Sequence, residues 1–333
     1  MSFRRRAAAF WGRHRSLFWM LHSVWALATG VVVLLLARER YAFVPWVVVF
    51  LGLTWLSTLF FGSSAREEWT PTLGGEVSSY VTRSLYQETL FFLLPFYAYS
   101  TVLRSPNVVF LVLLAGLAIL SCLDLVFDRW LRTRPVFGLV FFATVAFAAI
   151  NLLLPILFSL PTRIATPVAA LGAVASSLPL ALHGEGRSRA QTLRVGVASA
   201  LILAIAMAVP ALVPPVPLRL QEATFAAGIE RETMTPGDPI ETGDAAADLP
   251  GRLVFLGQVF APADLRTGVH VEWRQDGTTV RTSREVEIVA HEGGFRVWDG
   301  LTEEVTPLGP GRYEVVLRTA AGRWFGRAVV TLR

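Results

Sequence analysis

Residues 193–217 read LRVGVASALILAIAMAVPALVPPVP, and this stretch divides the chain into two parts. Arg194 stands near its start, and no charged side chain follows until Arg219. An uncharged run of this length can form a helix that crosses ~30 Å of hydrocarbon. The prolines at its end lack an N–H and fix φ, so they should stop the helix and favour an extended exit. The sequence therefore predicts membrane helices before this stretch and a soluble β-domain after it.

The charge balance differs between the two parts. Residues 1–214 hold 17 Arg against 8 acidic residues, whereas residues 215–333 hold 13 Arg against 17 acidic residues. The net charges of +9 and −4 together give the +5 of the whole chain. Most of the basic side chains before residue 215 lie in short loops beside apolar runs, which is typical of an orientation signal in a membrane protein. We therefore expect a lipid bilayer as a partner and no nucleic acid.

Seven apolar segments are candidate membrane spans. If the N-terminus is cytoplasmic, thirteen Arg fall in the inner loops and four in the outer loops, as the positive-inside rule requires. An odd number of spans places the C-terminal domain on the opposite side, so the sequence predicts a multi-pass protein of the bacterial inner membrane with a periplasmic C-terminal domain. The predicted spans are 17–37, 41–62, 88–104, 107–127, 136–160, 164–182 and 193–213.

From Leu218 onward the apolar residues alternate, which is typical of β-strands. Asp276-Gly277 joins two such runs and predicts a tight hairpin turn. Short strands separated by turn signals favour an immunoglobulin-like β-sandwich. Residues 231–250 have few apolar anchors and are predicted to form a mobile surface loop. The predicted fold is an α-helical transmembrane bundle of about seven spans in residues 1–214, followed by an immunoglobulin-like sandwich in residues 215–333.

Several longer motifs carry a resemblance to a known family. In the membrane part they are SLYQETLFFLLPFYAYS and ILSCLDLVFDRW, and in the β-domain they are VEWRQDG, GGFRVWDGL and GPGRYEVVLRTAAGRWFGRAVVTL. With them the chain resembles uncharacterised proteobacterial inner-membrane proteins that join a multi-span domain to a C-terminal β-domain, both of unknown function. The resemblance implies this architecture and location, and it supplies no activity or catalytic residues.

Ionisable and polar side chains within apolar segments are the first candidate site, because such residues often mark function in membranes. They could line one pocket that binds a proton or a headgroup, and the candidates are His22, Arg83, Gln87, Glu88 and Asp124. Each also has a structural interpretation: Glu88 at a helix N-terminus, Asp124 paired with a loop arginine, and His22 in one hydrogen bond. Asn151 lies in the outer half of its segment, and Pro95 with the following Tyr97 and Tyr99 could shape a groove.

In the β-domain the aromatic residues are the second candidate. Trp273 alternates with valines that face the core, so we expect it inside, whereas Phe295 and Trp298 are the candidate contact surface. His270 and His291 lack a third ligand with a motif spacing, and the single cysteine, Cys122, excludes multi-cysteine metal sites. We therefore predict no metal site.

The sequence holds no P-loop, dinucleotide-binding, GxSxG or HExxH motif. No catalytic residue or cofactor is predicted, and a non-enzymatic function is favoured. Our first hypothesis is a membrane-anchored binding or scaffolding protein that presents the β-domain to envelope protein or glycan. The alternative is a small transporter or lipid-handling protein with a polar site near Glu88 and Asp124; an intramembrane enzyme that uses the same carboxylates is the third.

Overall fold

The computed structural model describes most of the chain from residue 73 onward. The described ranges are 73–122, 135–182 and 210–333, with gaps at 231, 250, 262–266, 290–293 and 305, and a few isolated positions lie elsewhere. The predicted spans at 17–37, 41–62 and 193–213 fall almost entirely outside these ranges.

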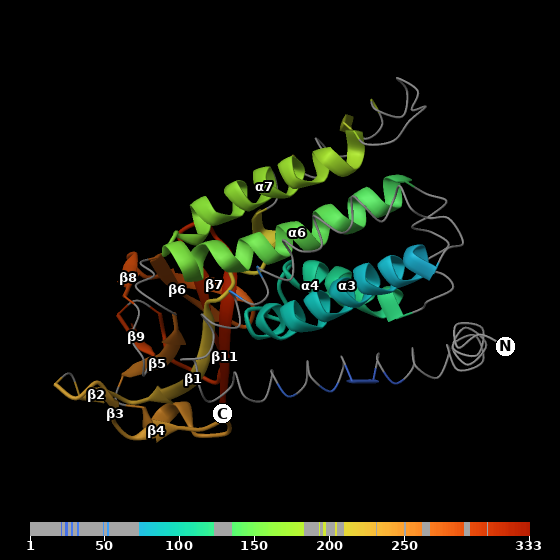
Figure 1. The fold of residues 1–333 in the computed structure, drawn as a ribbon. Helices are drawn as coiled ribbons and strands as arrows, with labels where there is room; N and C mark the ends of the chain where they lie inside the picture. Colours follow the sequence, from blue (N-terminus) through green and yellow to red (C-terminus); the bar gives the residue numbers. More distant parts are fainter. Residues whose placement is uncertain are drawn as a thin grey trace.

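Within the described ranges, four long helices lie side by side at one end of a β-structure (Figure 1). α6 packs against α7, and α3 packs against α4 and touches α6. Gly172 of α7 allows the close approach of α6, because a Cβ at this position would lie 3.1 Å from Ile150 Cδ1. Aromatic rings fill the core between α3, α4 and α6, where Phe110 meets Phe147 edge to face at 5.7 Å. The helices are α3 (Leu73–Tyr99), α4 (Val108–Cys122), α6 (Pro135–Phe158) and α7 (Thr162–Leu182).

The predicted bundle of seven spans with an immunoglobulin-like sandwich is wrong as a description of this fold. Among the described helices, only Val136–Phe158 is long and apolar enough to cross a membrane. α4 has 15 residues, which rise about 23 Å. α3 carries Arg83 and Glu88 within its apolar sequence, and Thr and Ser dilute the apolar composition of α7. Apolar windows in the sequence did not show where each helix ends. What the described residues retain of the prediction is a β-rich C-terminal region.

That region holds two main antiparallel sheets and a short two-stranded ribbon. One sheet has the strand order β4-β1-β5-β9, and the other has the order β11-β10-β6-β7 with β8 also paired to β6. The ribbon joins β2 and β3. The strands are β1 (Arg219–Ala226), β2 (Ile229–Glu230), β3 (Thr235–Pro236), β4 (Pro239–Ile240), β5 (Arg252–Phe260), β6 (Thr267–Gln275), β7 (Thr278–Thr282), β8 (Val286–Ile288), β9 (Phe295–Thr302), β10 (Gly311–Thr319) and β11 (Trp324–Leu332).

Alternation along the strands creates the core of this region. Val269, Val271 and Trp273 of β6 are buried, as their spacing predicts, and they pack with apolar residues of both sheets. The predicted hairpin at Asp276-Gly277 is confirmed, since both residues have positive φ, at 50° and 89°. Such a turn needs the left-handed region, which glycine and aspartate enter more easily than most residues.

Residues 231–250, predicted as a mobile loop, instead contain β3, β4 and a short 3-10 helix at Ala246–Asp248. The last strand holds this segment, because Gly243 N–H donates to Thr331 O and Arg333 N–H donates to Asp244 O. These backbone bonds do not depend on apolar side chains, which explains why the composition did not reveal them.

Candidate functional site

A group of buried polar side chains lies where the helices meet the β-structure. The covalent link there is very short: Val216 belongs to the core of the helices and Leu218 belongs to the core of the sheets. Only Pro217 separates the two cores along the chain. The proline exit predicted from the sequence therefore leaves little freedom between the two layers.

The turn between β10 and β11 projects one arginine into the helices. Arg323 is 1% exposed. Its Nη1 donates to Thr166 Oγ1 at 2.7 Å, and its Nη2 donates to the carbonyl of Thr162 at 2.5 Å. Both acceptors lie in the first turns of α7. The turn that presents Arg323 is closed by its own backbone, since Thr319 N–H donates to Arg323 O.

The hydrogen bonds continue from Arg323 across three helices. Thr166 Oγ1 lies 3.0 Å from Asn151 Oδ1 on α6. Asn151 Nδ2 donates to Tyr97 Oη on α3 at 3.2 Å, and Tyr97 Oη donates to the carbonyl of Ala148 at 2.9 Å. We call these four side chains, Arg323, Thr166, Asn151 and Tyr97, the buried joint. All four are almost completely inaccessible to solvent.

The electrostatics of the buried joint are unusual. No carboxylate of the described residues forms an ion pair with Arg323, and its Nε has no hydrogen-bond partner among them. Burial lowers the pKa of the Arg323 guanidinium to about 10, because a charged group loses its hydration there. A cation surrounded by neutral oxygens is sensitive to any change of geometry, since no countercharge compensates for a lost hydrogen bond.

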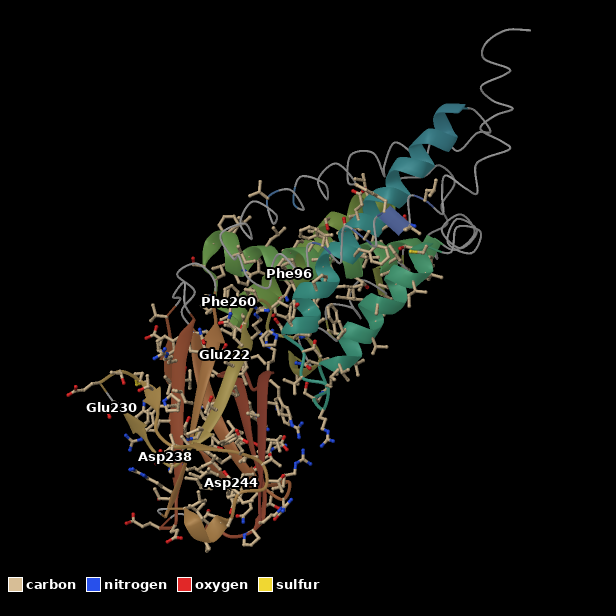
Figure 2. All side chains as sticks on the ribbon, turned by 90° about the horizontal axis from the view of Figure 1, so that it is seen from below. Phe96, Glu222, Glu230, Asp238, Asp244 and Phe260 are labelled. Carbon is tan, nitrogen blue, oxygen red and sulfur yellow. The ribbon has the colours of Figure 1, made fainter. Side chains whose placement is uncertain are left out.

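Two further contacts flank the buried joint. Arg219, at the start of β1, lies over the ring of Tyr99 at 4.7 Å and over the ring of Phe260 at 5.5 Å. On the other side, Asn107 Nδ2 donates to the carbonyl of Trp324 at 2.8 Å, and Asn107 also holds Ser105 within the loop before α4. Figure 2 shows Phe260 and Glu222 at the end of the sheets nearest the helices.

The predicted intramembrane site is only partly within the described residues. His22, Asp124 and the side chain of Arg83 lie outside them. Gln87 is buried, and its Nε2 donates to the carbonyl of Ser121 on α4 at 2.6 Å, whereas Glu88 is exposed. The two neighbours therefore face different surroundings. Near these residues, the described side chains form a helix–helix contact and no group of ionisable side chains.

The predicted contact surface of the β-domain is divided as well. Trp298 is 38% exposed on β9, while Phe295 is partly buried against the core of the sheets. Trp273 is buried as expected, and its Nε1 donates to Asp299 Oδ2 at 3.0 Å. Burial raises the pKa of the Asp299 carboxyl, and the nearby Arg281 opposes this shift.

Sequence reasoning singled out Tyr97 and Asn151 separately but did not place them together, and it missed Arg323 and Thr166. The pattern of apolar and polar residues around the turn between β10 and β11 does not indicate that Arg323 is buried, because a charged residue at a hairpin turn is normally solvated. The sequence did offer one indication of a contact between two predicted helices. Asn151 and Thr166 are uncharged polar residues at corresponding depths of those helices. Among the described residues, no group of three His, Cys, Asp or Glu lies together as a metal site would require.

Fold and site together define a helical protein with a C-terminal β-structure that is fastened to its helices by a buried polar joint. Residues 2–249 match the family of unknown function DUF5924, and the chain belongs to that family. The match includes β1 to β4 and ends before β5, so the sheet of β4, β1, β5 and β9 contains strands on both sides of that limit. No curated protein matches the chain.

Proposed function

We propose that this protein is a membrane-anchored scaffold of the bacterial inner membrane that presents its β-structure, in a fixed orientation on the periplasmic side, to envelope protein or glycan. The observation that carries the proposal is the buried joint. Arg323, which pairs with no carboxylate of the described residues, keeps its hydrogen bonds to α7 only while its hairpin stays docked, so the joint favours one relative orientation.

The membrane part of the proposal rests on apolar surface. α6 contains one candidate span, Val136–Phe158. Neighbouring helices also expose large apolar side chains, among them Val109, Val112 and Ile119 of α4 and Leu171 of α7. In water, such an apolar surface would favour association with other molecules, whereas in a membrane it can contact the lipid chains.

The presenting surface is the outer side of β9. Trp298 is exposed there, and an exposed indole can stack on a sugar ring or fill a pocket on a protein partner. The transporter or lipid-handling alternative has less support, because Glu88 is exposed and its neighbour Gln87 is engaged in a contact with α4. We therefore favour presentation over transport.

The test combines membrane placement with contact at β9. Cys122 is the single cysteine, so a Cys122→Ser chain with Thr278→Cys carries one label site on exposed β7. We expect the protein to resist alkaline carbonate extraction and Thr278→Cys to react with a membrane-impermeant maleimide on spheroplasts. Release by carbonate, or labelling only after lysis, would overturn the placement.

For the contact, a photoreactive phenylalanine analogue replaces Trp298 in one strain and exposed Thr278 in a matched control. We expect cross-linked envelope protein or glycan from position 298 in intact cells and little from position 278. Weaker adducts from position 298 are expected after Arg323→Ala, because a loosened hairpin no longer fixes the orientation. Equal adducts at both positions would argue against presentation by this face.

A further inference from the structure

Two arginines of the sheet formed by β6, β10 and β11 converge on one tryptophan. The guanidinium of Arg274 lies 4.6 Å from the ring centre of Trp324, and that of Arg318 lies 5.1 Å from it. A guanidinium placed over an indole ring uses its face for this contact and leaves the N–H groups at its edges available to an anion. Two like charges on one ring require an opposite charge nearby.

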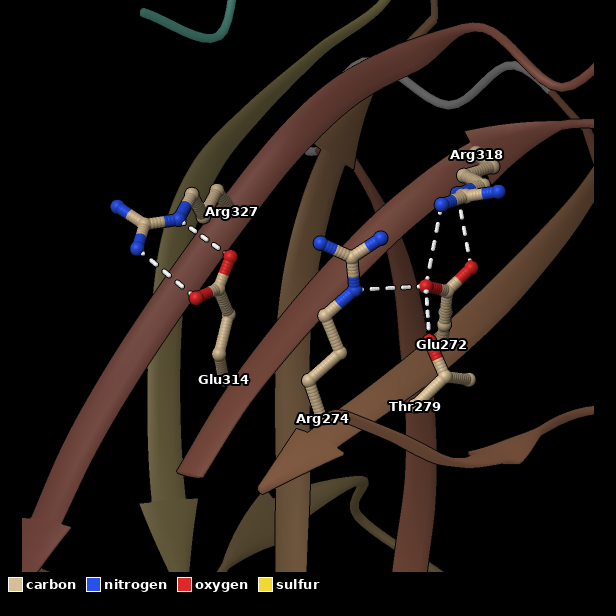
Figure 3. A network of polar contacts seen from close by, with 6 residues as sticks. All are labelled: Glu272, Arg274, Thr279, Glu314, Arg318 and Arg327. Atoms are coloured by element: carbon tan, nitrogen blue, oxygen red, sulfur yellow. Dashed lines mark hydrogen bonds and ion pairs between the residues drawn. The ribbon is translucent and has the colours of Figure 1, made fainter. Parts of the chain in front are cut away.

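One carboxylate supplies part of that charge. Glu272 accepts from Arg274 Nε at 2.7 Å, pairs with Arg318 Nε at 2.9 Å and also accepts from Thr279 Oγ1 at 2.9 Å (Figure 3). A second carboxylate, Glu314, lies opposite Arg274 on β10, and Arg327 donates to both of its oxygens. Three guanidinium groups therefore stand against two carboxylates, which leaves a net positive charge.

Arg274 has unused donors. It binds Glu272 through Nε alone, and its two terminal nitrogens make no hydrogen bond to any described residue. Figure 3 shows both nitrogens pointing along the sheet toward the end where Arg318 lies. The side chains of Arg274 and Arg318 are 21% and 29% exposed, so an anion from solvent or from a membrane surface can reach them.

The position of the cluster indicates which anion is available. The carbonyl of Trp324 accepts from Asn107, which places the cluster beside the loop between α3 and α4. That loop exposes Arg104 and Leu103, and Leu103 is 78% exposed. An exposed apolar side chain in this loop, together with arginines and a tryptophan in the neighbouring strands, is a combination typical of the boundary between acyl chains and headgroups. The acidic residues Asp238 and Asp244 lie toward the end of the sheets away from the helices, and Glu230 lies out to one side (Figure 2).

We propose that Arg274 and Arg318, stacked on Trp324, bind the phosphodiester of an anionic phospholipid in the membrane that holds the helices. This inference rests on the membrane placement proposed above. The terminal nitrogens of Arg274 form a fork that matches two phosphate oxygens, and Arg318 adds positive charge beside it. The carboxylate of Glu272 pairs with both guanidinium groups and holds them beside each other.

The test uses the full chain in detergent micelles that contain phosphatidylglycerol and phosphatidylcholine in equal amounts, with bound lipids counted by native mass spectrometry. We expect a preference for phosphatidylglycerol that falls about tenfold in the double variant Arg274→Gln and Arg318→Gln. The double variant Arg252→Gln and Arg333→Gln is the matched control. It also removes two positive charges, both from exposed side chains. Arg252 lies on β5 of the other sheet, and Arg333 follows the last residue of β11.

The outcomes separate the lipid site from the membrane placement. A protein that resists carbonate extraction but shows the same lipid preference in all variants would overturn the site and leave the placement intact. A protein that carbonate releases would remove the basis of both. An equal loss in the control with Arg252→Gln and Arg333→Gln would show that net charge alone attracts the lipid, and the proposed site would fail. If an added acidic peptide displaces the lipid at equimolar concentration, the face is a protein-binding surface and the proposal fails.

Discussion

Two arginines of one hairpin, Arg318 and Arg323, meet opposite conditions. Arg318 lies on the outer side of β10, stacks on Trp324 and pairs with the carboxylate of Glu272. Arg323 turns into the helices, where its hydrogen-bond acceptors are a hydroxyl and a carbonyl. A carboxylate buried beside Arg323 would lose its own hydration. Neutral oxygens avoid this cost and can still accept hydrogen bonds from the buried cation. Arg318 therefore contributes to the charge of the surface, whereas Arg323 holds the hairpin in one position on the helices.

The largest effect is expected at the inner arginine. Arg323→Ala removes two hydrogen bonds and leaves a cavity at the buried joint, so the free energy of unfolding should fall by about 3 kcal/mol. Thermal unfolding in detergent, followed by circular dichroism, measures the change. Arg312→Ala on the same strand pair should cost under about 0.5 kcal/mol. Equal costs for the two variants would mean that the joint contributes nothing special.

The second effect follows the hydrogen bonds from Arg323 into the helices. Thr166→Val keeps the shape of the side chain but removes the oxygen that links Arg323 to Asn151. The buried guanidinium then loses one acceptor, and we expect a loss of about 2 kcal/mol. Combined with Arg323→Ala, the loss should be less than additive, because both variants break the same connection. Full additivity in a double-mutant cycle would rule out a continuous joint.

Much of the β-structure could be predicted from the sequence, because alternation and the Asp276-Gly277 turn are local signals. The helical part could not be predicted as well. Segments such as 107–127 are apolar throughout, yet α4 ends at Cys122. Apolar composition alone does not distinguish a helix that spans a membrane from one that packs in a core. The buried joint depends on contacts between residues up to 161 positions apart in the chain, Thr162 and Arg323, for which no local pattern exists.

The third effect concerns the ion pairs that Glu272 forms with Arg274 and Arg318. Glu272→Gln leaves the guanidinium groups of Arg274 and Arg318 close together without a carboxylate between them. We expect a loss of about 1 kcal/mol in low salt. Because the arginines are partly exposed, added salt should shrink this loss, whereas the loss caused by Arg323→Ala should stay nearly constant. Unfolding at two ionic strengths measures both, and the same salt dependence in the two variants would refute the contrast.

The smallest effect concerns Glu314. Its hydrogen bonds with Arg327 lower the pKa of its carboxyl below the ordinary value of 4.5. A lowered pKa in the folded state contributes stability above the unfolded value, and this contribution is lost as the pH falls through the folded value. Glu314→Gln should therefore cost about 0.5 kcal/mol at pH 7 and almost nothing in strong acid. Melting curves across pH 3–7 test this, and a cost independent of pH would contradict it.

The distance between the helices and the sheets tests most directly whether the buried joint fixes their orientation. Spin labels are attached at two exposed positions of a Cys122→Ser chain, Leu171→Cys on α7 and Thr278→Cys on β7. Pulsed electron paramagnetic resonance in lipid nanodiscs then measures the distance between the two labels. If the buried joint fixes the orientation, the distance distribution is narrow and broadens clearly after Arg323→Ala, but not after Arg312→Ala. A distribution that stays equally narrow after Arg323→Ala would show that the buried joint does not fix the orientation.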